Sequence, residues 1–283
     1  MKKILMAGAA IIIFAALSQA QEAAPSSPSL EGGKKLMGLG KYDEAIAELA
    51  KVAEAQPDSA DAHYALGDAY SGKGMWDEFV AEYRKALKLK PSAEAYINLG
   101  LSFNNKGKWS ESIEEFNEAV KLDGRDTRAY NGLAWAYLQK NLIDEAVAAY
   151  KKSIAINPGD ISAHSQLGVA YTKKKKYKEA VAEYQEVLKL NTSDPDKALK
   201  NYLIARLFAL MEKKKDSLDY LGKAVSLSAS FGQTAKTEDA FKAYAKDPVF
   251  LKLTAVKKVE EKKKEEMKEE TKEAPKETPL EAP

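Results

Sequence analysis

Between residues 30 and 253 the chain repeats one arrangement of apolar, small and polar positions every 33–34 residues. Each copy holds two apolar stretches separated by a short turn rich in lysine, and successive copies are separated by a turn rich in aspartate. This pattern predicts a row of helix pairs, in which each pair buries its apolar faces only against its neighbours. A less regular sixth pair is expected from about residue 196 to residue 227.

The first helix of each pair carries a short motif. A Leu followed by Gly or Ala, with an aromatic residue three positions later, recurs as Leu66-Gly67-x-x-Tyr70, Leu99-Gly100-x-x-Phe103, Leu133-Ala134-x-x-Tyr137 and Leu167-Gly168-x-x-Tyr171. The small residue allows a close approach between helices. Pro91 and Pro158 end second helices, because proline has no N–H to extend them.

These motifs resemble the tetratricopeptide repeat (TPR), a helix–turn–helix of about 34 residues. The resemblance implies an all-α, right-handed superhelical solenoid over residues 30–253, with about six helix pairs and C-terminal capping helices. The ending Asp247-Pro248-x-Phe250-x-x-Leu253 is similar to the segment that closes many bacterial TPR arrays. We expect it to cover the open face of the last repeat, because a terminal repeat needs such a cap to stay soluble.

The resemblance also implies that the concave surface, lined by the first helices, binds a peptide or helix of a protein partner. The family's groove positions correspond here to Tyr64, Asp68, Ile97, Asn98, Leu101, Asn105, Arg128, Asn131, Trp135, Ser165, Gln166, Val169, Tyr202 and Arg206. Asn98, Asn131 and Gln166 fall at nearly equivalent places, and their amides are suited to bonding an extended backbone. Trp135 has two interpretations: it anchors a partner, or it packs across neighbouring first helices.

Lysines gather in the turns within pairs and aspartates in the turns between pairs. Helix capping and the helix dipole account for the aspartates, but not for the densest lysine runs. We call these runs the basic rim, and they are Lys173, Lys174, Lys175, Lys176, Lys213, Lys214 and Lys215. An alternative function follows: the rim, together with the charged tail, binds envelope polymer or an anionic membrane surface.

Residues 1–20 have the pattern of a secretory signal peptide. Lys2 and Lys3 precede an apolar run from Ile4 to Leu17, and small residues lead to Ala20. The run is short of the roughly 20 residues that span a bilayer, which favours cleavage over anchoring. We therefore expect an exported, periplasmic or secreted protein of bacterial type. Residues 21–29 are expected to be a linker, and residues 254–283 a disordered tail rich in Lys, Glu and Pro.

Little in the sequence points to chemistry. The chain has no cysteine, and its 44 basic and 42 acidic residues give no bulk charge for binding nucleic acid. His63 and His164 occupy the same place in repeats three apart, where packing is expected rather than catalysis or a shared metal site. Nucleotide-binding, nucleophile-elbow and zinc-protease motifs are absent from the sequence. We therefore expect no enzyme activity, catalytic residue, metal or cofactor, and predict a scaffold that binds another envelope protein.

Overall fold

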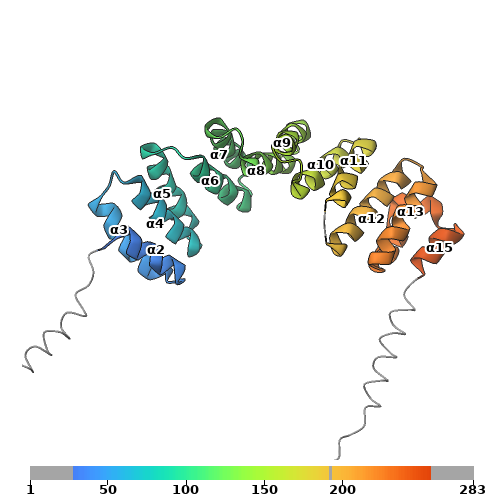
Figure 1. Ribbon diagram of the computed structural model, residues 1–283, viewed down its shortest axis with the longest axis horizontal. Coiled ribbons are helices and arrows are strands. Elements are labelled where there is room, and N and C mark those ends of the chain that lie inside the picture. Colours follow the sequence, from blue (N-terminus) through green and yellow to red (C-terminus); the bar gives the residue numbers. More distant parts are fainter. Residues whose placement is uncertain (1–27, 191–192, 256–283) are drawn as a thin grey trace, which may run out of the picture. The chain divides into compact units, whose positions relative to one another are not determined.

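The computed structural model describes residues 28–190 and 193–255, and these residues contain helices and no β-strand (Figure 1). The chain divides into two compact units between Ser102 and Phe103. The division lies inside a helix, α6, that the repeat register does not distinguish from the other first helices. The predicted signal peptide, and most of the predicted linker and tail, lie outside the described residues.

The first unit contains α2 (Leu30–Gly38), α3 (Tyr42–Ala55), α4 (Ala60–Gly72), α5 (Trp76–Leu89) and the start of α6 (Ala93–Asn105). Each helix from α2 to α4 packs against the next one along the chain. Glycines set the close contacts: an added Cβ at Gly67 would lie 2.5 Å from the Tyr83 ring, and one at Gly33 would lie 2.3 Å from Leu49. The predicted role of Gly67 is confirmed.

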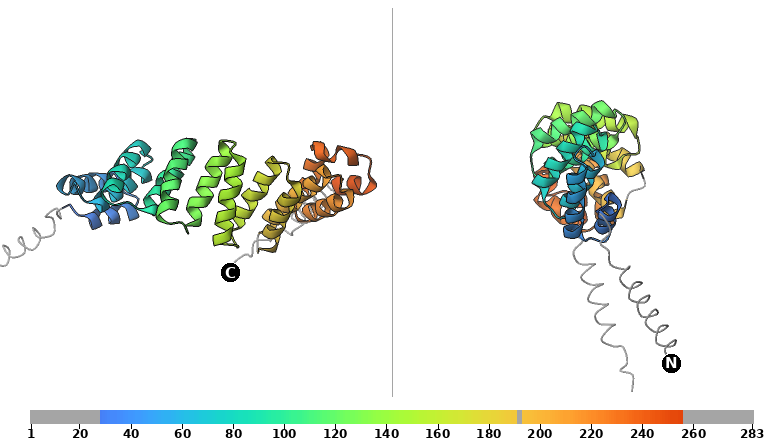
Figure 2. Two further views of the ribbon diagram at one scale, coloured as in Figure 1. Left: turned by 90° about the horizontal axis from the view of Figure 1, so that it is seen from above. Right: turned by 90° about the vertical axis from the view of Figure 1, so that its left-hand side faces the viewer.

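The second unit continues the same packing, and Figure 2 shows its helices side by side in sequence order. Its regular helices are α7 (Trp109–Leu122), α8 (Thr127–Gln139), α9 (Ile143–Ile156), α10 (Ile161–Lys173), α11 (Tyr177–Lys189), α12 (Asp194–Leu210) and α13 (Lys214–Leu227). Gly168 lies against the Tyr184 ring, and Gly132 against Phe116. The handedness of the superhelix stays a prediction.

The turn inside each helix pair has one residue with a left-handed backbone. That residue is Gly40, Gly74 or Gly107 in the first three pairs, but Asn141 (φ 60°), Lys175 (φ 57°) and Glu212 (φ 59°) in the last three. The following N–H donates to the carbonyl five residues earlier, for example from Lys176 to Tyr171 at 2.9 Å. This bond closes the first helix of each pair, as in a Schellman motif.

The second unit ends in α14 (Ser230–Thr237), a short 3₁₀ helix η1 (Asp239–Tyr244) and α15 (Pro248–Thr254). Phe241, Tyr244 and Phe250 are buried with Tyr202 of α12 in one apolar cluster. Asp247 caps α15 by accepting bonds from the N–H groups of Val249 (2.9 Å) and Phe250 (3.1 Å). The predicted cap is confirmed. Thr254 is fully buried, so the boundary predicted for the tail falls one residue early.

Candidate partner-binding face

In each of the first helices α8, α10 and α12, one stripe of residues lies on the side of the helix that faces away from the buried motif Leu or Ile. Two positions after that motif residue stand Trp135, Val169 and Arg206 in the three helices. Trp135 keeps 39 % of its surface exposed, although its neighbours Leu133 and Ala134 are buried. The helix turns Trp135 outward because the two preceding residues fill the interface with the adjacent helices. We call the exposed stripes of α8, α10 and α12 the first-helix face.

The last first helix, α12, adds apolar surface that the sequence prediction missed. Leu199 and Leu210 are 39 % and 43 % exposed. They stand at the repeat positions of Arg128 and Asn105, which were predicted as groove residues. The repeat register would have identified both leucines as groove residues. They were missed because α12 is longer than the other first helices and its motif is degraded.

The predicted amide ladder is partly used by the fold. The Asn131 side chain donates to Asp160 Oδ2 at 2.7 Å, and Asp160 Oδ1 in turn caps α10 by accepting from the Ala163 N–H at 2.9 Å. The Asn98 side chain donates to the Tyr83 hydroxyl at 3.3 Å. Gln166 makes no side-chain hydrogen bond to the described residues and is the amide most available to a partner.

In the first unit, the corresponding residues are Tyr64, Asp68 and Leu101. The Tyr64 hydroxyl donates to the Lys90 carbonyl at 2.7 Å, and burial raises the pKa of Tyr64 to about 12. The Tyr83 hydroxyl donates to Asp68, whose pKa is raised chiefly by burial. Leu101 is 44 % exposed. The two polar side chains, Tyr64 and Asp68, are thus already bonded within the unit.

Two predicted groove residues are wrong, because the fold buries them. Ile97 has no exposed surface, and Tyr202 has 5 %. The Tyr202 ring stacks on Phe231 at 4.9 Å and belongs to the C-terminal cap. Both residues stand two positions before the motif Leu or Ile, where a large side chain turns into the helix interface.

The remaining predicted residues keep some exposure. Asn105 and Arg128 are exposed, while Ser165, Val169 and Arg206 are partly buried. Arg128 bonds Asp126, with Nη2 at 2.7 Å from Oδ2, and this pairing is the main cause that lowers the pKa of Asp126. Arg206 Nη1 lies 3.6 Å from Glu238 Oε1. Both cations are therefore held by the fold rather than unpaired.

The basic rim is partly neutralised within the second unit. Lys174 pairs with Asp144, and Lys214 pairs with Asp247. These pairs are the main cause that lowers the pKa of each aspartate. Lys213 Nζ lies 5.8 Å from the centre of the Phe208 ring. The other rim residues are exposed and make no ion pair with any described residue; they are Lys173, Lys175, Lys176 and Lys215.

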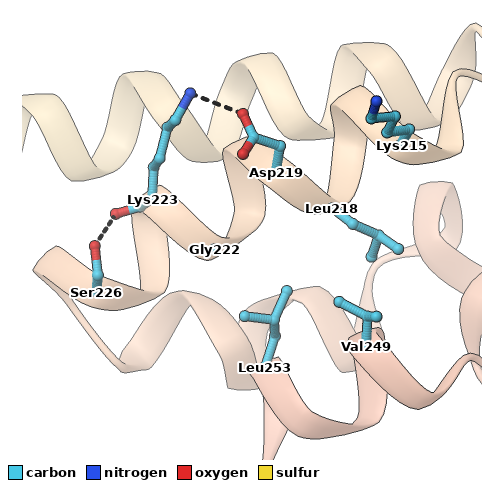
Figure 3. Close-up of a pocket in the computed structure, with 8 residues that line it drawn as sticks. All are labelled: Lys215, Leu218, Asp219, Gly222, Lys223, Ser226, Val249 and Leu253. Atoms are coloured by element: carbon cyan, nitrogen blue, oxygen red, sulfur yellow. Dashed lines mark hydrogen bonds and ion pairs between the residues drawn. The ribbon is translucent and has the colours of Figure 1, made fainter.

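An open pocket of about 610 Å³ lies between α13 and α15 (Figure 3). Leu218, Val249 and Leu253 form its apolar walls, and Lys223 pairs with Asp219 at 2.8 Å on its edge. The close-up shows the three apolar side chains converging on the gap.

The two histidines tie helices together. His63 Nδ1 lies 2.6 Å from Glu82 Oε2, and its Nε2 lies 2.9 Å from the Pro57 carbonyl. His164 repeats this arrangement with Glu183 at 2.7 Å and the Pro158 carbonyl at 3.1 Å. Both rings are 7 % exposed. The predicted packing role is confirmed, and within residues 28–190 and 193–255 no cluster of His, Cys, Asp and Glu is arranged to hold a metal.

Comparison with known families settles the class of protein. Models of the tetratricopeptide repeat match residues 30–94, 97–161 and 161–194. The chain belongs to the tetratricopeptide repeat family. No curated protein matches it.

Solved structures agree with this TPR assignment. MamA is 31 % identical over 56 % of this chain and 92 % of MamA, with a TM-score of 0.53. PilF of Pseudomonas aeruginosa is 22 % identical over 80 % of this chain and 95 % of PilF, with a TM-score of 0.55. YrrB, described as a TPR protein with an unusual peptide-binding site, is 20 % identical over 67 % of this chain and 98 % of YrrB, with a TM-score of 0.59. The TPR fold and these neighbours support a role in protein interaction, and TPR proteins are generally non-catalytic scaffolds.

Proposed function

We propose that this TPR protein is a non-catalytic scaffold of the bacterial cell envelope that binds a partner protein on the first-helix face of its second unit. The observation that carries the proposal is the exposed Trp135 in the middle of α8. Tryptophan is over-represented among the residues that dominate binding energy at interfaces. Leu199 and Leu210 extend the apolar surface of the same stripe onto α12.

The exposed area of Trp135 is sufficient for an energetically important contact. An exposure of 39 % on a side chain of about 250 Å² leaves about 100 Å² that a partner can cover. At about 25 cal/mol per Å², covering it contributes about 2.5 kcal/mol to binding. One such residue accounts for a change in affinity of about 60-fold.

The neighbouring groups indicate the chemistry of the partner. On α10, the next first helix after that of Trp135, the face offers the partly exposed Val169 and the unbonded amide of Gln166. An extended segment or a helix with one large apolar residue fits this combination, because apolar contacts then supply affinity while the amide bonds a backbone group. YrrB, a protein of the same fold, has a peptide-binding site according to its description.

The envelope location rests on the signal-peptide pattern of residues 1–20. Fractionation of the native cells, followed by N-terminal sequencing of the mature protein, tests it. A protein that begins at Gln21 outside the cytoplasm supports export, whereas a cytoplasmic protein that begins at Met1 removes the envelope from the proposal.

The binding role is tested with two matched tryptophan variants. Trp135→Ala removes the proposed anchor, and Trp76→Ala removes a tryptophan of similar exposure, 37 %, from a second helix in the first unit. Proteins that co-purify with each variant are quantified by mass spectrometry. The account predicts that one partner is lost with Trp135→Ala and retained with Trp76→Ala. Equal retention by both variants would refute it.

A further inference from the structure

A regular pairing of charges runs along the turns inside the helix pairs. In three repeats, the lysine that follows the end of the first helix bonds a residue of the previous repeat. That residue is the second one of the previous repeat's second helix, 30 positions earlier in the sequence. The bonded pairs are Lys73 with Asp43, Lys140 with Ser110, and Lys174 with Asp144. This pairing neutralises or satisfies one lysine in each of these turns and ties neighbouring repeats together.

The pairing ends at the last repeat. Lys178 occupies the position that Asp43 and Asp144 hold in other repeats, and Met211 stands where a partner lysine is expected. The acceptor of the pair is therefore replaced by a further cation. The sequence prediction of the basic rim did not include Lys178, because Tyr177 separates that residue from the run of four lysines at positions 173–176.

The consequence is a group of exposed lysines that make no ion pair with the described residues. We call them the unpaired lysines, and they are Lys173, Lys175, Lys176, Lys178, Lys213 and Lys215. They lie between the last residue of α10 and the start of α11, and between the α12–α13 turn and the start of α13, in consecutive repeats. Glu179, Glu212 and Asp216 stand among them in the sequence, and Lys176 also contributes, after Lys174, to lowering the pKa of Asp144. Four acidic residues thus accompany six lysines. A net positive surface remains at one edge of the second unit.

Apolar side chains accompany these lysines. Leu210, the last residue of α12, is 43 % exposed, and Met211 beside it is partly exposed. Lys213 follows two residues later, with its ammonium over the Phe208 ring. A turn that combines cations with exposed apolar residues suits a lipid surface, where the cations meet head groups and the apolar groups enter the acyl boundary. A soluble polyanion has no apolar interior in which Leu210 could be buried.

We propose that the unpaired lysines, with Leu210, form a docking site for an anionic lipid surface. The site shares Leu210 with the first-helix face, but it does not include Trp135, which lies in the middle of α8. Vesicle binding by the purified chain needs no partner protein, so a failure of this proposal is distinguishable from a failure of the partner-binding proposal. Attraction to acidic lipids amounts to about fivefold in affinity for each lysine near the surface. It weakens with salt, because the lysines are exposed.

The test is sedimentation of the full chain with vesicles of phosphatidylcholine containing about one third phosphatidylglycerol, a composition that gives a negative surface. Pure phosphatidylcholine vesicles give the background for each variant. One variant carries Gln at four of the unpaired lysines: Lys173, Lys175, Lys176 and Lys178. The matched control carries Gln at four exposed lysines elsewhere in the second unit: Lys121, Lys152, Lys189 and Lys236. Both variants lose the same net charge.

The proposal predicts that binding to the acidic vesicles falls at least about tenfold in the first variant and less than about twofold in the control. Equal losses in both variants would attribute binding to bulk charge and overturn the proposal. No difference between acidic and neutral vesicles for the unmodified chain would overturn it as well.

Two further variants separate lipid binding from other causes. Leu210→Ser is expected to weaken binding to acidic vesicles about threefold or more, without a change in net charge. The lipid proposal fails if Leu210→Ser leaves vesicle binding unchanged and the variant with four Gln substitutions also loses binding to soluble polyglutamate. In that case the site binds an anionic polymer. Lys175→Gly removes one cation and is expected to stabilise the turn, because it relieves a left-handed backbone (φ 57°). Weaker binding by this variant with an unchanged or higher urea midpoint therefore reports the lost charge rather than unfolding.

Discussion

Replacing Lys175 with glycine should stabilise the second unit, although it removes a whole side chain. Lys175 has φ 57°, a left-handed conformation that costs an L-residue about 1–2 kcal/mol and costs glycine almost nothing. Glycine also makes the unfolded chain more flexible, which lowers the unfolding free energy by about 0.4–1 kcal/mol. The expected net gain in unfolding free energy is therefore about 0.5–1 kcal/mol.

A matched control lies two residues away. Lys173 is the last residue of α10 and has a helical backbone, so glycine there relieves no strain and costs about 0.5–1 kcal/mol in helix propensity. The same exchange of residue type should thus change stability in opposite directions at positions 173 and 175. The first three repeats already have glycine at the position of Lys175, namely Gly40, Gly74 and Gly107.

The assay combines equilibrium urea unfolding with hydrogen exchange, because a repeat array need not unfold in one step. The Lys176 N–H, which bonds the Tyr171 carbonyl at 2.9 Å, reports locally on the turn. We expect slower exchange of this amide and a higher urea midpoint in Lys175→Gly, and the reverse in Lys173→Gly. A lower midpoint for Lys175→Gly, or equal effects of the two exchanges, would refute the reasoning from backbone strain.

Three further predictions concern packing and capping. Gly132→Ala should lower the unfolding free energy by about 1–3 kcal/mol, because the added Cβ would lie 2.1 Å from the Phe116 ring; Gly38→Ala, with open space around it, is the control in urea unfolding. Phe241→Ala should cost about 3–5 kcal/mol and expose the end of the second unit to limited proteolysis, because Phe241 is 1 % exposed in the cap; a proteolysis pattern unchanged from wild type would contradict this. Asp247 should support the cap at neutral pH and not in strong acid: its pKa is lowered below 3.8, so its contribution is complete above that value and is lost as the pH falls through the folded-state value. Asp247→Asn should therefore be less stable than wild type at pH 7 and equal to it in acid, as thermal melts across pH would show.

The repeat register could be predicted from the sequence because it depends on local residue types. Gly67 lies against Tyr83, as its place after Leu66 indicated, and Phe250 closes the last repeat, as the terminal motif indicated. Asp126 and Asp160 cap first helices, which accounts for their places in the turns between pairs. Each of these outcomes follows from contacts within one repeat or between neighbours.

Exposure within the first helices was harder to predict, because one position in the register has different neighbours in different repeats. Asn131 and Ile97 stand at the same repeat position, yet Asn131 bonds Asp160 at its edge and Ile97 is fully buried. Tyr202 occupies that position in α12, where the C-terminal cap covers it. The burial of a groove residue therefore depends on the next element along the chain as well as on its own helix.

The division between the two units could not be predicted for a similar reason. It falls at Ser102 and Phe103, inside a first helix whose Leu99-Gly100 motif is intact. The motif reports the packing of a helix with its partner, and it carries no signal for where the compact units divide. The unpaired lysines could also be predicted only in part. Lys178 is noticed only when its repeat position is compared with the same position in earlier repeats, where Asp43 and Asp144 stand.

The central claim is that Trp135 lies where a partner protein binds. The most direct test places a photo-crosslinking amino acid at position 135 of the protein in its native cells, with a control at position 76, and identifies the crosslinked species by mass spectrometry. The account predicts one discrete protein captured from position 135 and absent from position 76. Capture of the same species from both positions, or of lipid alone from position 135, would contradict it.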